Sequence, residues 1–442
     1  MGKKLFGIDI PEELRKSNYY ALFLSTGLVM LVYMIPTIVL PRFLKEIIGV
    51  PQKSFGEINS AIQNIGTVTS ILFLSLVGSL SDRHGRRILL LLGLSGATLS
   101  FILYYYSPAL GAFLGINPLW LVFLFSLFLS LSMTFSLPQL ITLVADYTDR
   151  KSRGKSMAIM STMMGVGVTL SFVSFSLIQK RIGSAKVFLL GAFFVFLTLI
   201  IAKLFIVDHM PHKSKDMTAK RNSVIKNWKD VSSVIEKSQG LKVCFFSHFA
   251  ASSDRIMLGI FLNIWVVRVA GDFNLTPAKA TAMGGMIIGL SSVVALVSTM
   301  FWGIFVDRFG RMPVLATGLL SSGIGFSLIG TISNPFSLEV KLCGILTGLG
   351  VAAVSVSTSS LTADFAPKKI LGSIFSISNA IASLGTLFFV QLGGFLFDYV
   401  GFSRPFTLVG AAELIAFIYT ISKWKQVPKI TRDTKISHEV QH

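Results

Sequence analysis

The stretch "GSLSDRHGRR" (residues 78–87) carries four charged side chains and a histidine within ten residues. Long apolar runs precede and follow it, and the second begins "ILLLLGLSGATLSFILYYY" at residue 88. A short polar link between two such runs is typical of a chain that turns at a membrane surface and crosses back. The decamer therefore predicts a membrane-spanning fold with a turn at the boundary of the bilayer.

The composition of the whole chain agrees with this interpretation. The chain has 442 residues, of which 52% are hydrophobic and 14% charged, and its mean hydropathy is +0.71. Soluble domains carry roughly 25% charged residues. The net charge of +19 would suit a nucleic-acid partner, but the Lys and Arg are confined to short segments between apolar runs. We therefore expect a lipid bilayer, and no nucleic acid, as the surrounding partner.

Twelve runs approach the length of about 20 apolar residues that a helix needs to cross a bilayer. They are continuously apolar rather than alternating, which favours helices over a barrel. The sequence thus predicts an all-α integral membrane protein with twelve transmembrane helices. The predicted spans are 19–40, 57–80, 88–106, 119–143, 156–178, 187–207, 243–267, 280–302, 314–332, 338–361, 371–397 and 405–422.

The distribution of cationic residues predicts the orientation of these spans. If the N-terminus lies inside, 28 of the 40 Lys and Arg fall in inner segments, as the positive-inside rule requires. We expect a multi-pass protein of the plasma (inner) membrane with both termini cytoplasmic and an uncleaved first helix. The expected domains are a cytoplasmic N-terminus (1–18), a six-helix bundle (19–207), a cytoplasmic linker (208–242), a second six-helix bundle (243–422) and a cytoplasmic tail (423–442).

The Lys-rich linker invites two interpretations. Residues 224–235 could form an amphipathic helix at the membrane surface, or the linker could be a soluble loop that binds a partner.

The opening decamer occurs twice. Residues 303–312 read "GIFVDRFGRM" and repeat its Gly-Asp-Arg-Gly-Arg spacing. A second pair, "ADYTDRKSRGKS" (145–156) and "ADFAPKKILGSI" (363–374), also repeats. In each half the first motif follows the second helix and the second motif follows the fourth. The sequence therefore resembles the major facilitator superfamily over essentially its full length. The resemblance implies two pseudo-symmetric six-helix bundles around a central cavity, and transport by alternating access.

The resemblance also implies a conformational latch at the repeated turns. Gly78 would let another helix approach closely, and Gly85 would allow a tight turn. Arg83, Arg86 and Arg87 could bridge to Asp146 or Asp149. Simple anchoring by the positive-inside rule is the alternative. The residues expected in the latch are Gly78, Asp82, Arg83, Gly85, Arg86, Asp146, Arg153, Gly303, Asp307, Arg308, Gly310, Arg311 and Asp364.

Ionisable groups inside the membrane predict a binding or coupling site, because each costs about 2.5–3.5 kcal/mol or more to insert. Asp254 and Arg255 lie at the middle of the seventh span, and His248 shares the face of Arg255. The stretch "AASSD" (250–254) could break this helix. Arg255 could hold an anionic group and Asp254 could carry a proton, or the two could form a structural ion pair. His248 could instead hydrogen-bond between helices.

Weaker candidates lie on other spans. Tyr33 on the first span and Gln139 on the fourth could line a cavity, although either could equally join two helices. Glu413 on the twelfth span is at least as well explained by a structural role. Cys244 and Cys343 are expected to be core residues.

The sequence predicts a secondary active transporter for a small organic solute, anionic or amphipathic, with proton-coupled export as the favoured mode. Proton-coupled uptake and a non-transporting membrane receptor or sensor are the alternatives. No cofactor, metal site or enzymatic activity is expected, and the coupling ion is expected to be H⁺. The protein is expected to act as a monomer.

Overall fold

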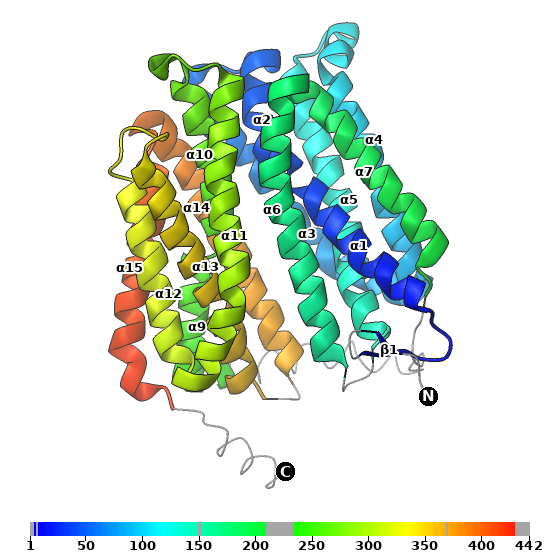
Figure 1. Cartoon of the computed structure of the whole chain (residues 1–442), viewed down its shortest axis with the longest axis vertical. Helices are drawn as coiled ribbons and strands as arrows, with labels where there is room; N and C mark the ends of the chain where they lie inside the picture. The colour runs from blue at the N-terminus through cyan, green and yellow to red at the C-terminus, as the bar shows by residue number, and fades with distance from the viewer. Residues whose placement is uncertain (1–3, 6–7, 149–151, 209–232, 368–369, 429–442) are drawn as a thin grey trace. The chain divides into compact units, whose positions relative to one another are not determined.

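The computed structural model describes residues 4–5, 8–148, 152–208, 233–367 and 370–428. Twelve helical stretches in this part of the chain are long and apolar enough to cross a membrane, and each overlaps a predicted span (Figure 1). The all-α membrane fold is therefore confirmed. The spans are Lys16–Ile48, Gln52–His84, Arg86–Leu114, Pro118–Asp146, Arg153–Ile182, Ser184–Phe205, Gln239–Val269, Pro277–Phe309, Arg311–Ile329, Leu338–Phe365, Leu371–Tyr399 and Arg404–Gln426.

Two short features lie outside the spans. A two-residue antiparallel pair, β1 (Lys4–Leu5) with β2 (Ile8–Asp9), precedes the first span. Residues 224–232 of the expected surface helix lie outside the described part of the chain, as does Asp149.

The chain packs into two compact units. Unit 1 comprises residues 1–213, 259–292 and 397–400, and unit 2 comprises residues 214–258, 293–396 and 401–442. The predicted division into bundles at 19–207 and 243–422 stays a prediction, because the units are defined by packing rather than by sequence repeat.

Unit 1 contains the helices of the first six spans. These helices are α1 (Lys16–Tyr33), α2 (Ile35–Phe43), the π-helix η1 (Leu44–Ile48), η2 (Gln52–Ser54), α3 (Phe55–His84), α4 (Arg86–Leu114), α5 (Pro118–Asp146), α6 (Arg153–Ile182) and α7 (Ser184–Phe205). Unit 1 also holds η3 (Gly271–Phe273), most of α10 (Asp254–Val269) and the first half of α11 (Pro277–Phe309).

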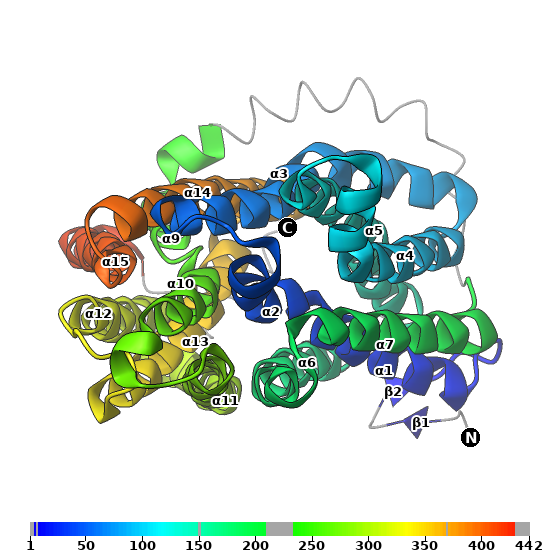
Figure 2. The ribbon, with the colours of Figure 1, turned by 90° about the horizontal axis from the view of Figure 1, so that it is seen from above.

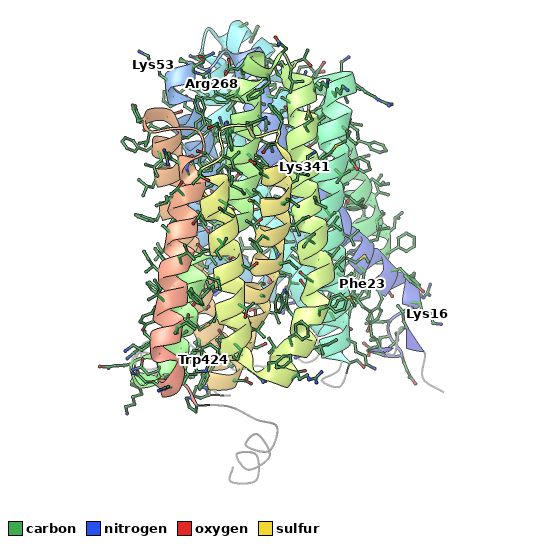
Figure 3. The ribbon with its side chains drawn as sticks, turned by 60° about the vertical axis from the view of Figure 1, so that its left-hand side comes forward. Lys16, Phe23, Lys53, Arg268, Lys341 and Trp424 are labelled. Atoms are coloured by element: carbon green, nitrogen blue, oxygen red, sulfur yellow. The ribbon has the colours of Figure 1, made fainter. Side chains whose placement is uncertain are left out.

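Unit 2 contains α9 (Gln239–Ala250), α12 (Arg311–Ile329), α13 (Leu338–Phe365), α15 (Arg404–Lys423) and η4 (Trp424–Gln426), together with the second half of α11 and most of α14 (Leu371–Tyr399). Figure 3 shows Lys341 near one end of this unit and Trp424 at the opposite end.

Small residues set the distance between the packed helices. In unit 1, α4 lies beside α5, and a Cβ added at Gly93 would meet the Ser132 carbonyl oxygen at 2.6 Å. In unit 2, α12 lies beside α13, and a Cβ at Gly318 would meet the Ala353 Cβ at 2.8 Å. Both neighbouring pairs are visible in Figure 2. Membrane helices attract one another through such close backbone packing, because lipid is as apolar as their side chains.

Each unit repeats the same packing pattern. In unit 1, α4 packs against α5 and α7, and in unit 2, α12 packs against α13 and α15. These helices come from the third, fourth and sixth spans of one half and the ninth, tenth and twelfth spans of the other. The repeat of the sequence motifs is therefore matched by a repeat in helix packing.

Two spans are broken near their middle. The seventh span ends α9 at Ala250 and starts α10 at Asp254, so the predicted break within "AASSD" is confirmed. The Ser252 hydroxyl donates to the Phe249 carbonyl at 2.8 Å, and the Thr386 hydroxyl donates to the Ser252 carbonyl at 3.2 Å. These side chains satisfy backbone groups that the break leaves without helical partners.

The first span is also broken, which the sequence analysis did not anticipate. α1 ends at Tyr33, and α2 begins at Ile35 with Pro36 in its first turn. Proline lacks the N–H that would continue the earlier helix. A proline in a long apolar run was the available signal for this break.

Candidate functional site

The charged turn (residues 78–87) joins α3 to α4 through Gly85, whose φ is +97°. Only glycine adopts this conformation without strain, so the predicted tight turn at Gly85 is confirmed. The turn leads directly into Arg86 at the start of α4. The expected close helix approach at Gly78 is wrong for this structure, because no described atom lies within 4 Å of a Cβ placed there.

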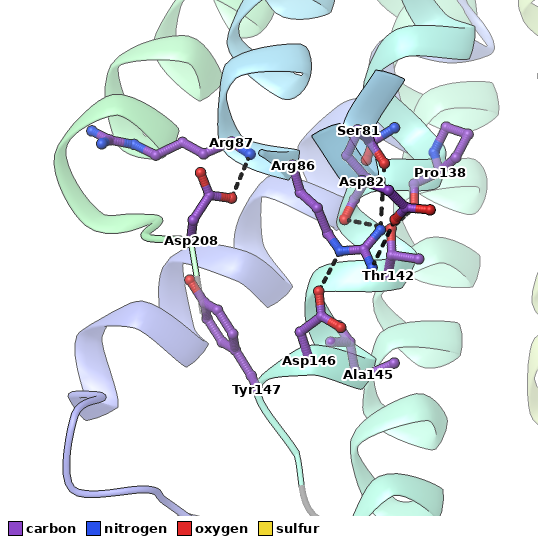
Figure 4. Close-up of polar contacts among 12 residues, drawn as sticks. Ser81, Asp82, Arg86, Arg87, Pro138, Thr142, Ala145, Asp146, Tyr147 and Asp208 are labelled. Carbon is purple, nitrogen blue, oxygen red and sulfur yellow. Dashed lines mark hydrogen bonds and ion pairs between the residues drawn. The ribbon is translucent and has the colours of Figure 1, made fainter. Parts of the chain in front are cut away.

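Arg86 is the centre of the charged turn (Figure 4). Its Nε donates to the carboxylate of Asp146, the last residue of α5. Its guanidinium also lies 3.6 Å from an Asp82 oxygen and 3.4 Å from the Ser81 hydroxyl. A guanidinium that joins two carboxylates fixes the end of α5 against the turn. The expected contact between Arg86 and Asp146 is therefore present.

The turn has a second acidic partner, Asp208, that sequence analysis missed (Figure 4). Its Oδ1 accepts from the backbone N of Arg87 at 2.9 Å, and the Arg87 guanidinium donates to the Lys203 carbonyl at 2.6 Å. Asp208 thus caps the first turn of α4, where an anion is stabilised by the exposed N–H groups. A charged residue directly after the sixth span was the available signal.

Tyr147 ties the same region together. Its hydroxyl donates to the Val207 carbonyl at 2.7 Å. Burial raises the pKa of Tyr147 to about 12, so the phenol stays protonated and keeps this hydrogen bond at neutral pH. The ends of α5 and α7 are therefore joined beside the charged turn.

Other predicted latch residues are exposed. Asp82, Arg83 and Arg153 lie at the surface of unit 1. Arg153 donates to the Ala145 carbonyl at 3.1 Å, which closes the link between α5 and α6. These contacts show a turn organised around Arg86, with Arg83 outside the described network.

The second turn (residues 303–312), in unit 2, repeats this arrangement. Arg311 Nε lies 2.6 Å from Asp364 Oδ2 at the end of α13, and Arg86 pairs with Asp146 through the same atoms in unit 1. Gly310 has a φ of +95°. Asp307 and Arg308 are exposed, and Gly303 has no described atom within 4 Å of an added Cβ. Both copies thus use the arginine directly after the turn glycine and an acid at the end of the fourth helix of the half.

Asp254 and Arg255 diverge at the break in the seventh span. Asp254 is 2% exposed, whereas Arg255 is exposed although it lies at the middle of the span. Adjacent residues of a helix point about 100° apart, so one position faces the packed interior of unit 2 and the other faces away from it. The sequence predicted one polar site for both residues, whereas in the structure Asp254 is buried and Arg255 is exposed.

Glu413 on α15 is the buried partner of Asp254. Its side chain is fully buried, and the two carboxyl groups lie within hydrogen-bond distance of each other. The sequence analysis named both acids but did not bring them together. The acid in the middle of the twelfth span was a signal, but its partner depends on the rotation of two helices far apart in sequence.

The remaining candidates lie apart from this pair. His248 on α9 hydrogen-bonds to the Ser378 hydroxyl of α14 at 2.8 Å, which matches the interhelical alternative. Tyr33 is 37% exposed at the end of α1. Gln139 is 1% exposed, and its Oε1 has no hydrogen-bond partner among the described residues. Tyr33 and Gln139 belong to unit 1, whereas His248 belongs to unit 2.

Unit 1 contains further polar contacts that sequence analysis missed. The carboxylate of Asp398 accepts from the backbone N of Gly56 and of Glu57 at 2.8 and 2.9 Å. Lys45 donates to the Val267 carbonyl at 2.6 Å, and Asn263 donates to the Thr37 carbonyl at 3.4 Å. These contacts join the first two spans to the seventh and eleventh.

Metal-ligand groups are not evident in the described part of the chain, where no three His, Cys, Asp or Glu residues are arranged to hold an ion. Cys244 and Cys343 are buried and unpaired with each other.

Twelve spans and a charged turn that occurs once in each half define a polytopic membrane protein with two similar halves. The family model of the Major Facilitator Superfamily matches residues 22–266 and 244–440, and the chain belongs to this superfamily.

Curated relatives extend over most of the chain. It is 30% identical to magnetosome protein MamH of Paramagnetospirillum magneticum over 94% of each chain. It is 28% identical to magnetosome protein MamZ of Magnetospirillum gryphiswaldense over 92% of this chain, which spans 62% of that relative. It is 25% identical to the multidrug resistance protein MdtG of Salmonella typhimurium over 80% of this chain and 84% of the relative.

Solved structures share the fold. The nucleoside transporter NupG matches with a TM-score of 0.73 at 12% identity, covering 92% of this chain and 99% of its own. A D-xylose-proton symporter matches with a TM-score of 0.70 at 15% identity, covering 93% and 98%. At these identities the likeness defines the fold alone.

Proposed function

We propose that the protein is a secondary active transporter that moves a small organic solute across the plasma membrane by alternating access. The solute is anionic or amphipathic, and the protein exports it in exchange for inward proton flow. The observation that carries this proposal is the position of Arg255. Arg255 is exposed at mid-span, beside a buried acid, at a helix break.

The cost of inserting charge supports a role in binding for Arg255. A guanidinium that faced lipid at mid-membrane would be strongly unfavourable, so such groups face polar spaces. An exposed cation there would attract the anionic part of a solute, while the apolar side chains around it would accept the remainder. Its neighbour Asp254 would then carry the coupling proton.

The repeated turns have a different role in this proposal. Arg86 with Asp146, and Arg311 with Asp364, fix the helix ends that must move as the cavity changes access. Asp82, Arg83, Asp307 and the other motif residues form a latch that is remote from the solute. The positive-inside distribution supports a cytoplasmic location for both turns and both termini.

Relatives bear on the direction of transport. The name of MdtG, multidrug resistance protein, favours export over uptake for this chain. The magnetosome relatives share higher identity with this chain, but their names state no substrate. The solute is therefore inferred from the charge of the site. Proton-coupled uptake and a receptor without flux remain the competing functions.

Ligand-dependent unfolding of the purified protein tests the binding part of the proposal. A solute that binds the folded state raises the melting temperature by mass action. We expect small amphipathic carboxylates to raise it, and Arg255→Ala to abolish the effect. Arg404→Ala is the matched control, because Arg404 is an exposed arginine in the same unit. An equal rise in Arg255→Ala would show that Arg255 does not bind the solute.

Flux in sealed proteoliposomes tests transport and its direction. The solute used is one that the unfolding assay has identified as a ligand. An imposed proton gradient should drive this solute toward the side from which the protons flow. Movement with the protons would favour uptake by symport, and binding without flux would favour the receptor.

A further inference from the structure

Two carboxyl groups face each other inside unit 2. Asp254 begins α10 and is 2% exposed, and Glu413 lies within α15 and is fully buried. Gly323 on α12 makes room for Glu413, because a Cβ at that position would lie 3.3 Å from the Glu413 Cβ. The packing of α12 against α15 therefore leaves room for Glu413 to be buried beside Asp254.

The ordinary donors near these carboxyls are the backbone N–H of Asp254 and the Ser322 hydroxyl, and neither makes a well-formed hydrogen bond to any of the four carboxyl oxygens. The nearby Ser322 hydroxyl already donates its hydrogen to the Gly318 carbonyl at 3.0 Å. Two ionised carboxylates at this separation would repel strongly where the dielectric is low. The donor between them must therefore be a proton bound to one of the acids.

The charged groups around the pair are few. Arg255 follows Asp254 directly, and its positive charge balances the single negative charge that a half-protonated pair carries. His248 on the preceding helix is engaged with Ser378. The other charged residues of α12 and α15 lie at the helix ends, at Arg311, Arg404 and Lys423.

We propose that Asp254 and Glu413 share one proton and form the proton-binding site of the transport cycle. The inference rests on the proposed transport function, and it brings the twelfth span into the coupling site. Asp254 is the acid of the pair that ionises more readily. It lies at the N-terminus of α10, where the helix dipole favours a carboxylate, and beside Arg255.

The helix break at 251–253 links the position of the Asp254 carboxyl to the angle between α9 and α10. Asp254 is the first residue of α10, so a change in the angle between α9 and α10 moves its carboxyl relative to Glu413 on α15. Separating the two acids removes the shared hydrogen bond. The shared proton then passes to water that enters between the separated acids, so that both acids are left as anions, with Asp254 beside Arg255. The pair thus binds one proton when the acids meet and releases one when they part.

Infrared spectroscopy of the full-length protein in lipid vesicles tests the shared proton without any substrate. We expect a protonated-carboxyl band at neutral pH that shifts on exchange into heavy water. Glu413→Gln should remove it, because Asp254 beside Arg255 then ionises. Asp254→Asn should shift it, because Glu413 loses its partner. Glu339→Gln is the control, since Glu339 is an exposed acid at the start of α13.

The band itself decides the inference. An unchanged band in Glu413→Gln would overturn the pair, and so would a band lost in Glu339→Gln. Should Glu413→Gln fail to fold, the shift in Asp254→Asn carries the test alone, and its absence overturns the proposal.

A transport measurement separates this inference from the proposed function. A proton gradient across vesicles should be dissipated by the wild type when solute is present, and at least tenfold more slowly by Glu413→Gln. The expected band without proton flux would refute the transport function while the shared proton stands. Equal proton flux in the wild type and Glu413→Gln would refute the coupling role of the pair while transport stands.

Discussion

At the scale of single residues, two residues of the same type can differ in whether they make a packing or an ionic contact in this protein. Gly93 leaves room for the neighbouring helix α5, whereas Gly78 on α3 has no described atom near its missing side chain. Arg86 binds two acids, whereas Arg83, three residues earlier, is exposed. Residues of one type therefore differ in what their replacement would remove.

Gly93→Ala should destabilise the protein by about 1–3 kcal/mol, the usual cost of overpacking a close interface. A Cβ at this position would lie 2.6 Å from the Ser132 carbonyl and 2.9 Å from the Phe135 Cβ. Thermal unfolding in detergent measures the change. Gly78→Ala is the control and should leave the melting temperature unchanged or slightly raised, because alanine favours the helix. Equal effects of the two substitutions would contradict the packing argument.

Arg86→Ala should lower stability by about 1–3 kcal/mol, because it leaves the Asp146 carboxylate without its guanidinium donor. Arg83→Ala should leave stability unchanged. If the turn is a latch, both variants should still bind solute while transport falls at least tenfold. Unfolding, binding and flux of the two variants measure these three properties. Wild-type flux in both would show that the turn only anchors the protein.

Some of these residue contacts could be predicted from the sequence, and others could not. A bridge from Arg83, Arg86 or Arg87 to Asp146 or Asp149 could be predicted because their motifs repeat together, but the sequence did not show which arginine makes it. Arg42 was assigned to a loop, yet it is 9% exposed and donates to the Gln179 carbonyl at 2.6 Å. Glu413 and Asp254 could not be paired, because no local pattern sets the rotation of α15 about its axis.

At the scale of elements, the break in the seventh span is held by its neighbour α14. The Thr386 hydroxyl of α14 binds the Ser252 carbonyl, and Gly385 lets the break approach closely. The break could be predicted from a cluster of small polar residues. The break in the first span was missed because Pro36 is surrounded by strongly apolar residues. These residues keep the hydropathy high on both sides of the break.

Gly385→Ala should distort the break, because its Cβ would meet both the Phe249 carbonyl and the Ser252 hydroxyl at 2.5 Å. We expect transport to fall more than tenfold and the melting temperature to drop. Gly372→Ala on the same helix is the matched control, since no described atom lies within 4 Å of its added Cβ. Should both variants transport equally, close packing at the break would not be required for the cycle.

At the scale of the molecule, unit 1 joins parts of both predicted bundles. Three polar contacts link the first two spans to residues 259–292 and 397–400, and they come from Asp398, Lys45 and Asn263. All lie in the part of unit 1 opposite the charged turn. Figure 3 shows Lys53 and Arg268 at this end and Lys16 near the other. A twelve-span fold could be predicted from hydropathy, but not which bundle ends meet, because that depends on the conformational state.

Asp398→Ala should weaken this junction, because Asp398 caps the N-terminal N–H groups of α3, a contact worth about 0.5–2 kcal/mol. If alternating access opens this end, the variant should favour the open state. Spin labels at Lys53→Cys and Lys279→Cys, two exposed positions of unit 1, measure the separation, with Cys244 and Cys343 replaced by serine. We expect a longer mean distance in Asp398→Ala. Glu57→Ala is the control, because it keeps the backbone N–H that Asp398 binds. A distance unchanged by Asp398→Ala, or lengthened equally by Glu57→Ala, would show that the cap does not hold this end closed.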